Sequence, residues 1–124
     1  MLGDNAAEAT VAVKDLGAAR KFYEQTLGLK PVHEEGEEAI EYQTGRSALL
    51  VYRSQFAGTN KATAVTWMVP DVESSVRELK SKGVRFEHYD LPQSKLVGDV
   101  HMIGDQKAAW FTDPDGNILA LVGH

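Results

Sequence analysis

The chain has 124 residues, of which 43% are hydrophobic and 25% are charged, and it contains no cysteine. This length and composition are typical of one globular domain whose core needs no covalent crosslinks. The lack of cysteine excludes disulfides, thiol catalysis and cysteine-ligated zinc. The formal net charge of −5, without any long basic run, argues against nucleic acid as a partner.

The sequence also gives no sign of a membrane or secretory protein. No apolar run approaches the roughly 18 residues that a membrane-spanning helix needs. The start, MLGDNAAEAT, has neither the basic end nor the apolar stretch of a signal peptide. We therefore expect a cytoplasmic protein with no membrane partner.

The first half of the chain predicts a strand, a helix and three further strands. Asp15 can cap the start of the helix, and Gly28 can end it in the left-handed conformation. Between them, apolar residues recur at helical spacing: Leu16, Ala19, Tyr23 and Leu27. We expect this helix near residues 16–27. The segments KPVHEE, EAIEYQT and SALLVYR follow as strands, with turns near Gly36 and Gly45.

The second half repeats this order. Asp71 and Gly83 bracket a helix that we expect near residues 72–82. The segments VRFEHYD, DVHMI, AAWFT and ILALV follow as strands. Residues 113–116 form a turn, because proline presets φ and glycine permits a positive φ.

Residues 87–100 form a long irregular connection between the first two of these later strands. Long connections in compact domains often serve as lids or binding loops. The sequence leaves two alternatives open, a lid that closes over a ligand and an inert excursion on the surface.

The two halves therefore form a weak internal repeat. The capping aspartate and the terminal glycine lie 13 residues apart in the first half and 12 apart in the second. We predict a single domain, residues 1–124, that consists of two βαβββ modules. The modules cover about residues 6–53 and 62–122, and residues 54–61 link them.

The opening VKDLGAARKFYEQTLGL and the ending WFTDPDGNILAL, together with the two modules, resemble the vicinal oxygen chelate superfamily. This group includes glyoxalase I, fosfomycin-resistance enzymes, extradiol dioxygenases and the bleomycin-resistance proteins. The resemblance covers essentially the whole chain. It implies an α+β fold in which a curled mixed sheet surrounds an open cup, with the helices on its outer side.

In the metal-dependent enzymes of this superfamily, four ligands face the cup. The resemblance carries these positions onto four residues of the present chain: Glu8, Leu49, Ala64 and Ala120. Leucine and alanine offer no donor atom, whereas zinc or iron catalysis normally needs at least three protein ligands. We therefore predict that the protein holds no metal and no other cofactor.

The side chains that face the cup define the candidate ligand-binding site. Strand side chains alternate between two faces, so each ligand position fixes the face of its neighbours. The predicted site comprises Glu8, Thr10, Leu49, Arg53, Thr66, Met68, His101, Trp110 and Ala120. His101 faces the cup only if the turn near Gly104 has an even number of residues, because a one-residue slip exchanges the faces. Trp67 and Phe111 should lie on the opposite face, in the core.

Three functions are compatible with these residues. The first is a metal-free protein, similar to bleomycin-resistance proteins, that binds an apolar or aromatic small molecule in the cup. The second is a metal-dependent lyase or dioxygenase of the glyoxalase type, for which Glu8 is the only remaining donor. The third is a metal-free enzyme that uses His101 and Glu8 as acid and base.

We also expect a homodimer, because an open cup leaves a sheet edge and a sheet face to cover.

Overall fold

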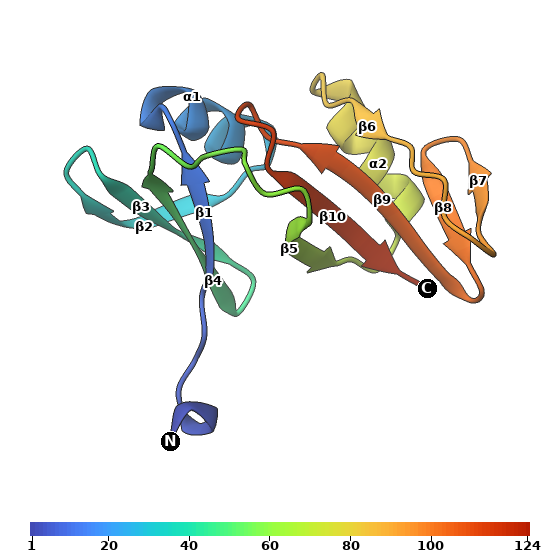
Figure 1. The fold of residues 1–124 in the computed structure, drawn as a ribbon, viewed down its shortest axis with the longest axis horizontal. Coiled ribbons are helices and arrows are strands. Elements are labelled where there is room, and N and C mark those ends of the chain that lie inside the picture. The colour runs from blue at the N-terminus through green and yellow to red at the C-terminus, as the bar shows by residue number, and fades with distance from the viewer.

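The computed structural model describes all residues, 1–124, and its helices follow the predicted order (Figure 1). The second half has one strand more than predicted, Lys95–Val97, inside the segment predicted to be irregular. A short 3₁₀-helix, η1 (Leu2–Asp4), precedes the first module. The elements of the first module are β1 (Ala9–Val13), α1 (Leu16–Arg20), η2 (Lys21–Thr26), β2 (Lys30–Glu35), β3 (Ala39–Thr44) and β4 (Ser47–Arg53). The elements of the second are β5 (Thr63–Met68), α2 (Val72–Ser81), β6 (Phe86–Glu87), β7 (Lys95–Val97), β8 (Val100–Ile103), β9 (Gln106–Thr112) and β10 (Ile118–Gly123).

Each module forms its own mixed sheet, so the predicted α+β class is confirmed. The first sheet has the strand order β1-β4-β3-β2, with β1 parallel to β4 and the other pairs antiparallel. The second has the order β5-β10-β9-β8-β7, with β5 parallel to β10. β6 also pairs with β9, so β6 and β8 share one edge of that strand. No helix of the structure is long and apolar enough to span a bilayer.

Both predicted helices are confirmed, and both begin as their sequences indicate. The carboxylate of Asp15 accepts the N–H of Gly17, and that of Asp71 accepts the N–H of Ser74, at 2.8 and 3.0 Å. The first helix differs from the prediction in one respect, because residues 21–26 are π-helical rather than α-helical. This turn contains Tyr23, which reaches into the second module.

One hydrophobic core lies between the helices and the sheets. It contains side chains of both modules, among them Val11 and Tyr23 from the first and Val76 and Phe111 from the second. Trp67 packs against this core and donates its indole N–H to the hydroxyl of Thr44 at 2.8 Å. The predicted core positions of Trp67 and Phe111 are therefore confirmed. The opposite face of each sheet carries no helix (Figure 1).

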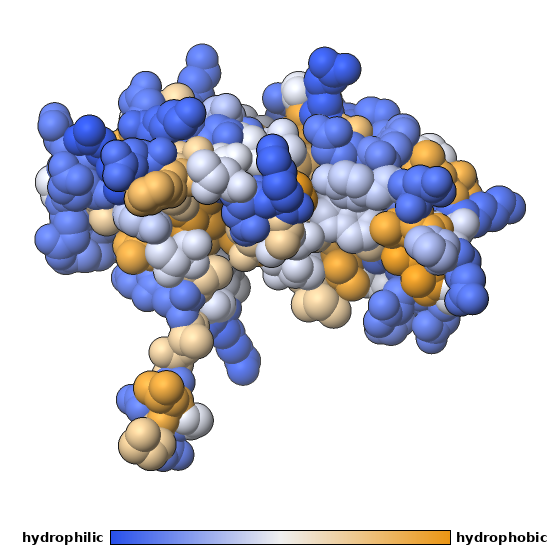
Figure 2. All heavy atoms as spheres, in the orientation of Figure 1, coloured by the Kyte–Doolittle hydropathy of each residue, from blue (hydrophilic) through white to orange (hydrophobic).

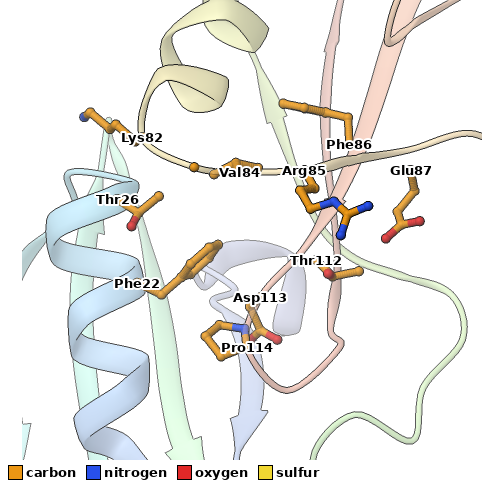
Figure 3. A pocket seen from close by; sticks show the side chains of 11 residues that line it. Phe22, Thr26, Lys82, Val84, Arg85, Phe86, Glu87, Thr112, Asp113 and Pro114 are labelled. Atoms are coloured by element: carbon orange, nitrogen blue, oxygen red, sulfur yellow. The ribbon is translucent and has the colours of Figure 1, made fainter.

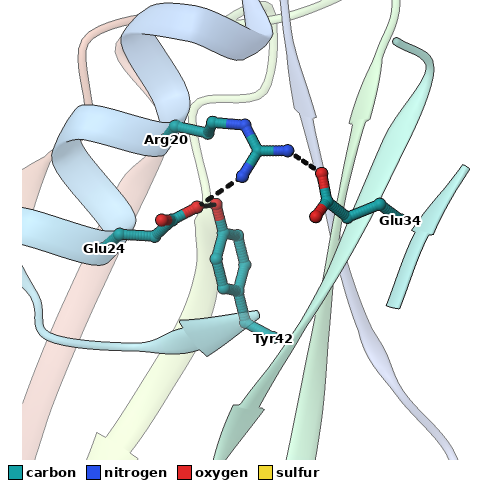
Figure 4. A network of polar contacts seen from close by, with 4 residues as sticks. All are labelled: Arg20, Glu24, Glu34 and Tyr42. Carbon is teal, nitrogen blue, oxygen red and sulfur yellow. Dashed lines mark hydrogen bonds and ion pairs between the residues drawn. The ribbon is translucent and has the colours of Figure 1, made fainter. Parts of the chain in front are cut away.

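The first helix is tied to its sheet by a polar network as well as by the core (Figure 4). The carboxylate of Glu24 accepts the hydroxyl of Tyr42 at 2.8 Å and the guanidinium of Arg20 at 3.0 Å. Arg20 also pairs with Glu34 on β2. Burial and the bond to Glu24 both raise the pKa of Tyr42, which therefore stays a neutral donor.

Asp113 joins the two modules. Its buried carboxylate accepts the hydroxyl of Tyr23 at 2.7 Å and the side-chain amide of Asn117 at 2.8 Å. It also accepts the backbone N–H groups of Asp115 and Asn117, both at 2.9 Å. The amide of Asn117 then donates to the carbonyl of Ala12 at 2.8 Å. The predicted turn at residues 113–116 therefore connects β1 and the first helix to the second sheet.

We predict that Tyr23→Phe destabilises the protein by about 1–3 kcal/mol, because it removes one donor from a buried carboxylate. Chemical denaturation followed by circular dichroism measures this difference. Tyr52→Phe is the matched control, since Tyr52 is exposed and its hydroxyl makes no hydrogen bond in the structure. Equal free energies of unfolding for the two variants would contradict the role of Asp113.

Candidate functional site

The helix-free face of the second sheet carries most of the predicted site. Trp110 on β9 is in register with Ala120 on β10, which is in register with Thr66 on β5. The turn between β8 and β9 has two residues, because Ile103 pairs with Gln106. This even number places His101 on the face of Trp110, as predicted for an even turn, and the two ring centroids lie 4.9 Å apart.

Trp110 reaches across a whole strand. Its indole N–H donates to the hydroxyl of Thr63 on β5 at 3.1 Å, although β10 lies between β9 and β5. The side chain therefore lies over β10, and Ala120 beneath it is only 2% exposed. A larger residue at position 120 would meet the indole ring. The superfamily resemblance implies a glutamate ligand at position 120. In this chain that position is an alanine, and the indole of Trp110 lies over it.

A row of apolar side chains continues along this face. Ala108 and Val122 lie in register between His101 on one side and Met68 on the other. Leu96 on β7 extends the row beyond His101. The two ends are open to solvent, since Leu96 is 43% exposed and Met68 is 71% exposed. This surface can accept a flat apolar molecule.

His101 is the one fully buried polar side chain on this face. It is 0% exposed, and its Nε2 accepts the backbone N–H of Tyr89 at 3.0 Å. Its Nδ1 has no hydrogen-bond partner. The ring of Tyr89 stacks on His101 at a centroid distance of 6.2 Å and meets Trp110 edge-on at 5.3 Å. Three aromatic rings therefore pack together at this point.

Tyr89 belongs to the long connection, residues 87–100, whose sequence is compatible with a lid and with an inert excursion. The connection is held down beside the site by Asp99, whose carboxylate bonds His88 at 2.8 Å and Lys80 of α2 at 2.7 Å. The hydrogen bonds from Lys80 and His88 lower the pKa of Asp99. The segment lies over part of the helix-free face, in contact with two predicted site residues.

The first sheet differs from the prediction. Leu49 and Val51 are in register with Ala9 and Val11, and both are fully buried in the core. The expectation that Leu49 faces the cup is therefore wrong. Its neighbour Leu50, in register with Thr10, takes the helix-free face instead. No residue of this strand offers a metal donor at that point.

Glu8 and Thr10 lie near Glu41 of β3, which pairs with Leu50 on the helix-free face. A hydrogen bond between the two carboxyl groups raises the pKa of Glu8, and their mutual repulsion adds to the shift. Arg53 lies apart, at the end of β4, where it pairs with Glu38 at 3.4 Å. The structure thus does not bring Arg53 together with the rest of the predicted set.

Ala64 also departs from the expected position. A bulge opposite Ile118 and Leu119 puts Thr63, rather than Ala64, in register with Ile118. Ala64 packs against the core. It also lines a hollow of about 490 Å³ where the two sheets meet. This hollow is lined by Ala9, Thr44, Gly45, Ser47, Ala48, Leu49, Ala64, Val65, Thr66, Trp67 and Met68.

The donor set does not fit a catalytic metal ion. Of the four positions that the resemblance assigns, only Glu8 has a donor atom. Ala120 is covered by the indole, and Leu49 points into the core. No three histidine, aspartate or glutamate side chains lie close enough to share an ion. The residues therefore supply fewer ligands than zinc or iron requires.

A second hollow, of about 520 Å³, lies at the junction of the modules (Figure 3). Phe22 and Thr26 face it from the first helix, and the segment Lys82–Glu87 forms the opposite wall. Its charges are mixed, with Arg85 near Glu87 and Asp113 below. The carboxylate of Asp113 is fully hydrogen-bonded within the protein and is not available to a ligand there.

Sequence reasoning missed two residues beside the predicted site. Glu41 follows from strand alternation once β3 is paired with β4, so it could have been found. Tyr89 lies in an irregular segment without periodicity, and nothing in the sequence indicates that its ring covers His101.

Comparisons with known proteins agree with this architecture. The family model of the Glyoxalase/Bleomycin resistance protein/Dioxygenase superfamily matches residues 6–121. No curated protein sequence matches the chain. Similar solved structures show the same fold at low sequence identity. Figure 2 shows that hydrophilic and hydrophobic residues are intermixed on one face of the molecule.

Three of these structures illustrate the range. A glyoxalase family protein from Enterococcus faecalis is 19% identical, with 98% of this chain and 99% of that chain covered and a TM-score of 0.74. Lactoylglutathione lyase from Agrobacterium tumefaciens is 19% identical, with 96% and 92% covered and a TM-score of 0.71. TnmS3, an antibiotic binding protein from Streptomyces sp. CB03234, is 19% identical, with 96% and 94% covered and a TM-score of 0.66.

We predict that Asp99 titrates below the range of an ordinary aspartate and that Lys80→Met raises its midpoint. The folded-state pKa is lowered, so the contribution of Asp99 to stability is present above its unfolded-state pKa. It is lost as the pH falls through the folded-state pKa, and the amide of Tyr89 should then exchange faster. Carboxyl-detected NMR measures the midpoint. Lys82→Met is the control, and an equal shift in both variants would refute the anchoring contact.

Proposed function

Because the chain belongs to the Glyoxalase/Bleomycin resistance protein/Dioxygenase superfamily, we propose that it binds an apolar or aromatic small molecule without a metal ion. The ligand lies on the helix-free face of the second sheet, against Trp110. The observation that carries this proposal is the position of the indole over Ala120. The indole of Trp110 thus lies over position 120, where the metal-dependent members of the superfamily need a carboxylate.

The composition of this face supports a ligand of that kind. Trp110 offers a half-buried indole, and Thr66 and Met68 lie beside it with exposed side chains. Binding sites for small molecules combine apolar and aromatic walls with a few polar groups. TnmS3 is an antibiotic binding protein with the same fold, which is consistent with binding as the activity, although the likeness itself concerns the fold.

The two enzymatic alternatives have less support. A metal-dependent lyase or dioxygenase lacks the donor set. An acid–base enzyme that uses His101 and Glu8 needs both groups at one substrate. Glu8 lies beside the first sheet in contact with Glu41, whereas His101 is fully buried in the second. We therefore favour binding over catalysis by these residues.

We also propose that two copies of the chain associate in the cytoplasm, without nucleic acid or membrane as partner. The open faces of both sheets include exposed apolar side chains, with Met68 the most exposed of them in the second sheet. Proteins usually cover such surfaces. Light scattering at micromolar concentration tests this association, and a monomer mass would contradict it.

We predict that the purified protein holds less than about 0.1 equivalent of zinc, nickel, iron or manganese, because one carboxylate does not make a stable site. Elemental analysis by mass spectrometry measures the content. Ala120→Glu should not raise it, since Ala64 and the core-facing Leu49 remain without donors. A stoichiometric metal, lost together with an enzymatic activity on chelation, would overturn the proposal.

We predict that Trp110→Ala weakens the binding of an aromatic probe by about 1–3 kcal/mol, because an aromatic anchor is lost. Calorimetric titration with acetophenone measures the affinity. Trp67→Phe is the matched control, since Trp67 packs against the core on the opposite face. Equal weakening in both variants would place the probe elsewhere.

A further inference from the structure

His101 presents a buried hydrogen-bonding atom that the protein leaves without a partner. The side chain is 0% exposed, and Nδ1 makes no hydrogen bond. Most buried polar side-chain atoms in folded proteins are paired, because an unpaired one costs about 1–3 kcal/mol. His101 is the one residue of this protein with such an atom. It lies on the proposed binding face, with its ring centroid 4.9 Å from that of Trp110.

The hydrogen bond at Nε2 of His101 determines whether Nδ1 is a donor or an acceptor. A backbone N–H can only donate, so Nε2 of His101 must accept the bond from Tyr89. In the neutral imidazole the proton therefore resides on Nδ1. The unpaired atom is a donor, and it requires an acceptor.

The surroundings of His101 supply no strong acceptor. Tyr89 stacks on its ring, Trp110 stands nearly perpendicular to it, and His88 lies at a centroid distance of 6.3 Å. The carboxylate of Asp99 is already bonded to His88 and Lys80. An aromatic ring face is only a weak acceptor. The protein thus combines flat aromatic walls with one unsatisfied N–H.

We propose that this N–H anchors the ligand, and that the ligand is a planar aromatic compound with a hydrogen-bond acceptor, such as a carbonyl oxygen, at one edge. This inference rests on the proposed function, since it concerns the same face. The aromatic body lies against Trp110, and the acceptor reaches Nδ1 of His101. A purely apolar ligand would leave the N–H unpaired and would bind less well.

Tyr89 is the group that has to move when such a ligand binds. Its ring covers His101, yet the residue is itself 37% exposed. Its backbone N–H is bonded to His101, but the residue lies outside any strand, in the connection after β6, so its ring can move without breaking a sheet. When no ligand is bound, the ring of Tyr89 therefore occupies the position between His101 and Trp110. A ligand has to displace this ring in order to bind there.

The test uses two probes of the same shape, acetophenone and α-methylstyrene, in which a C=O group is exchanged for C=CH₂. Calorimetry gives the ratio of their affinities for the wild-type protein and for His101→Phe. We expect the preference for acetophenone to fall about tenfold in the variant, because a buried donor no longer needs a partner. Tyr89→Ala should strengthen the binding of both probes, since the competing ring is gone.

A second measurement does not depend on the folding of a variant. In the wild-type protein, NMR of the imidazole nitrogens should show the proton on Nδ1. Acetophenone should shift this proton downfield, and α-methylstyrene should not. A proton on Nε2, or an unchanged affinity ratio in His101→Phe, would overturn the inference while leaving a binding face at Trp110. If neither probe binds the wild type or Tyr89→Ala, the proposed function itself fails.

Discussion

The fold depends on the carboxylate of Asp113. A buried carboxylate is costly unless several donors surround it, and here a tyrosine, an asparagine and two backbone groups do so. The bonds from Asp115 and Asn117 are local to the turn, whereas the bond from Tyr23 comes from the first module and forms only when both modules are in place. The amide of Asn117 also donates to the carbonyl of Ala12 in the first module. The pKa of Tyr23 is raised by burial and by this charge, so the phenol stays a donor. The two modules thereby pack around one shared hydrophobic core.

The shared core covers one face of each sheet, so the helix-free face of each sheet remains available for binding. Branched and aromatic side chains fill the helix side, whereas the second sheet's free face carries small residues at Ala108 and Ala120. Small residues on a strand normally weaken packing, but here they make room for a ring that extends across the sheet. Trp110 and Ala120 are therefore complementary in size. The hydrogen bond to Thr63 also holds the far end of the indole in position when no ligand is bound.

Much of this architecture follows from local sequence signals. Asp15 and Asp71 cap helices because their carboxylates reach nearby backbone N–H groups, and the two-residue turn after Ile103 fixes the face of His101. The face of Leu49 could not be predicted, because Leu49, Leu50 and Val51 are all apolar and alternation gives no signal. The bulge beside Thr63 and the packing of Tyr89 depend on contacts between distant segments. The local sequence pattern does not predict contacts of this kind.

The overlap of Trp110 with Ala120 has a consequence for how such a sequence can change. The indole can lie over β10 and bond Thr63 only after a small residue stands at position 120. A glutamate introduced at 120 in this chain meets the ring before any other ligand exists to hold an ion. The side chains at positions 110 and 120 therefore constrain one another, because the two residues are in register on neighbouring strands. A carboxylate at position 120 thus requires a change at position 110 as well, and the two kinds of site differ by at least these two substitutions.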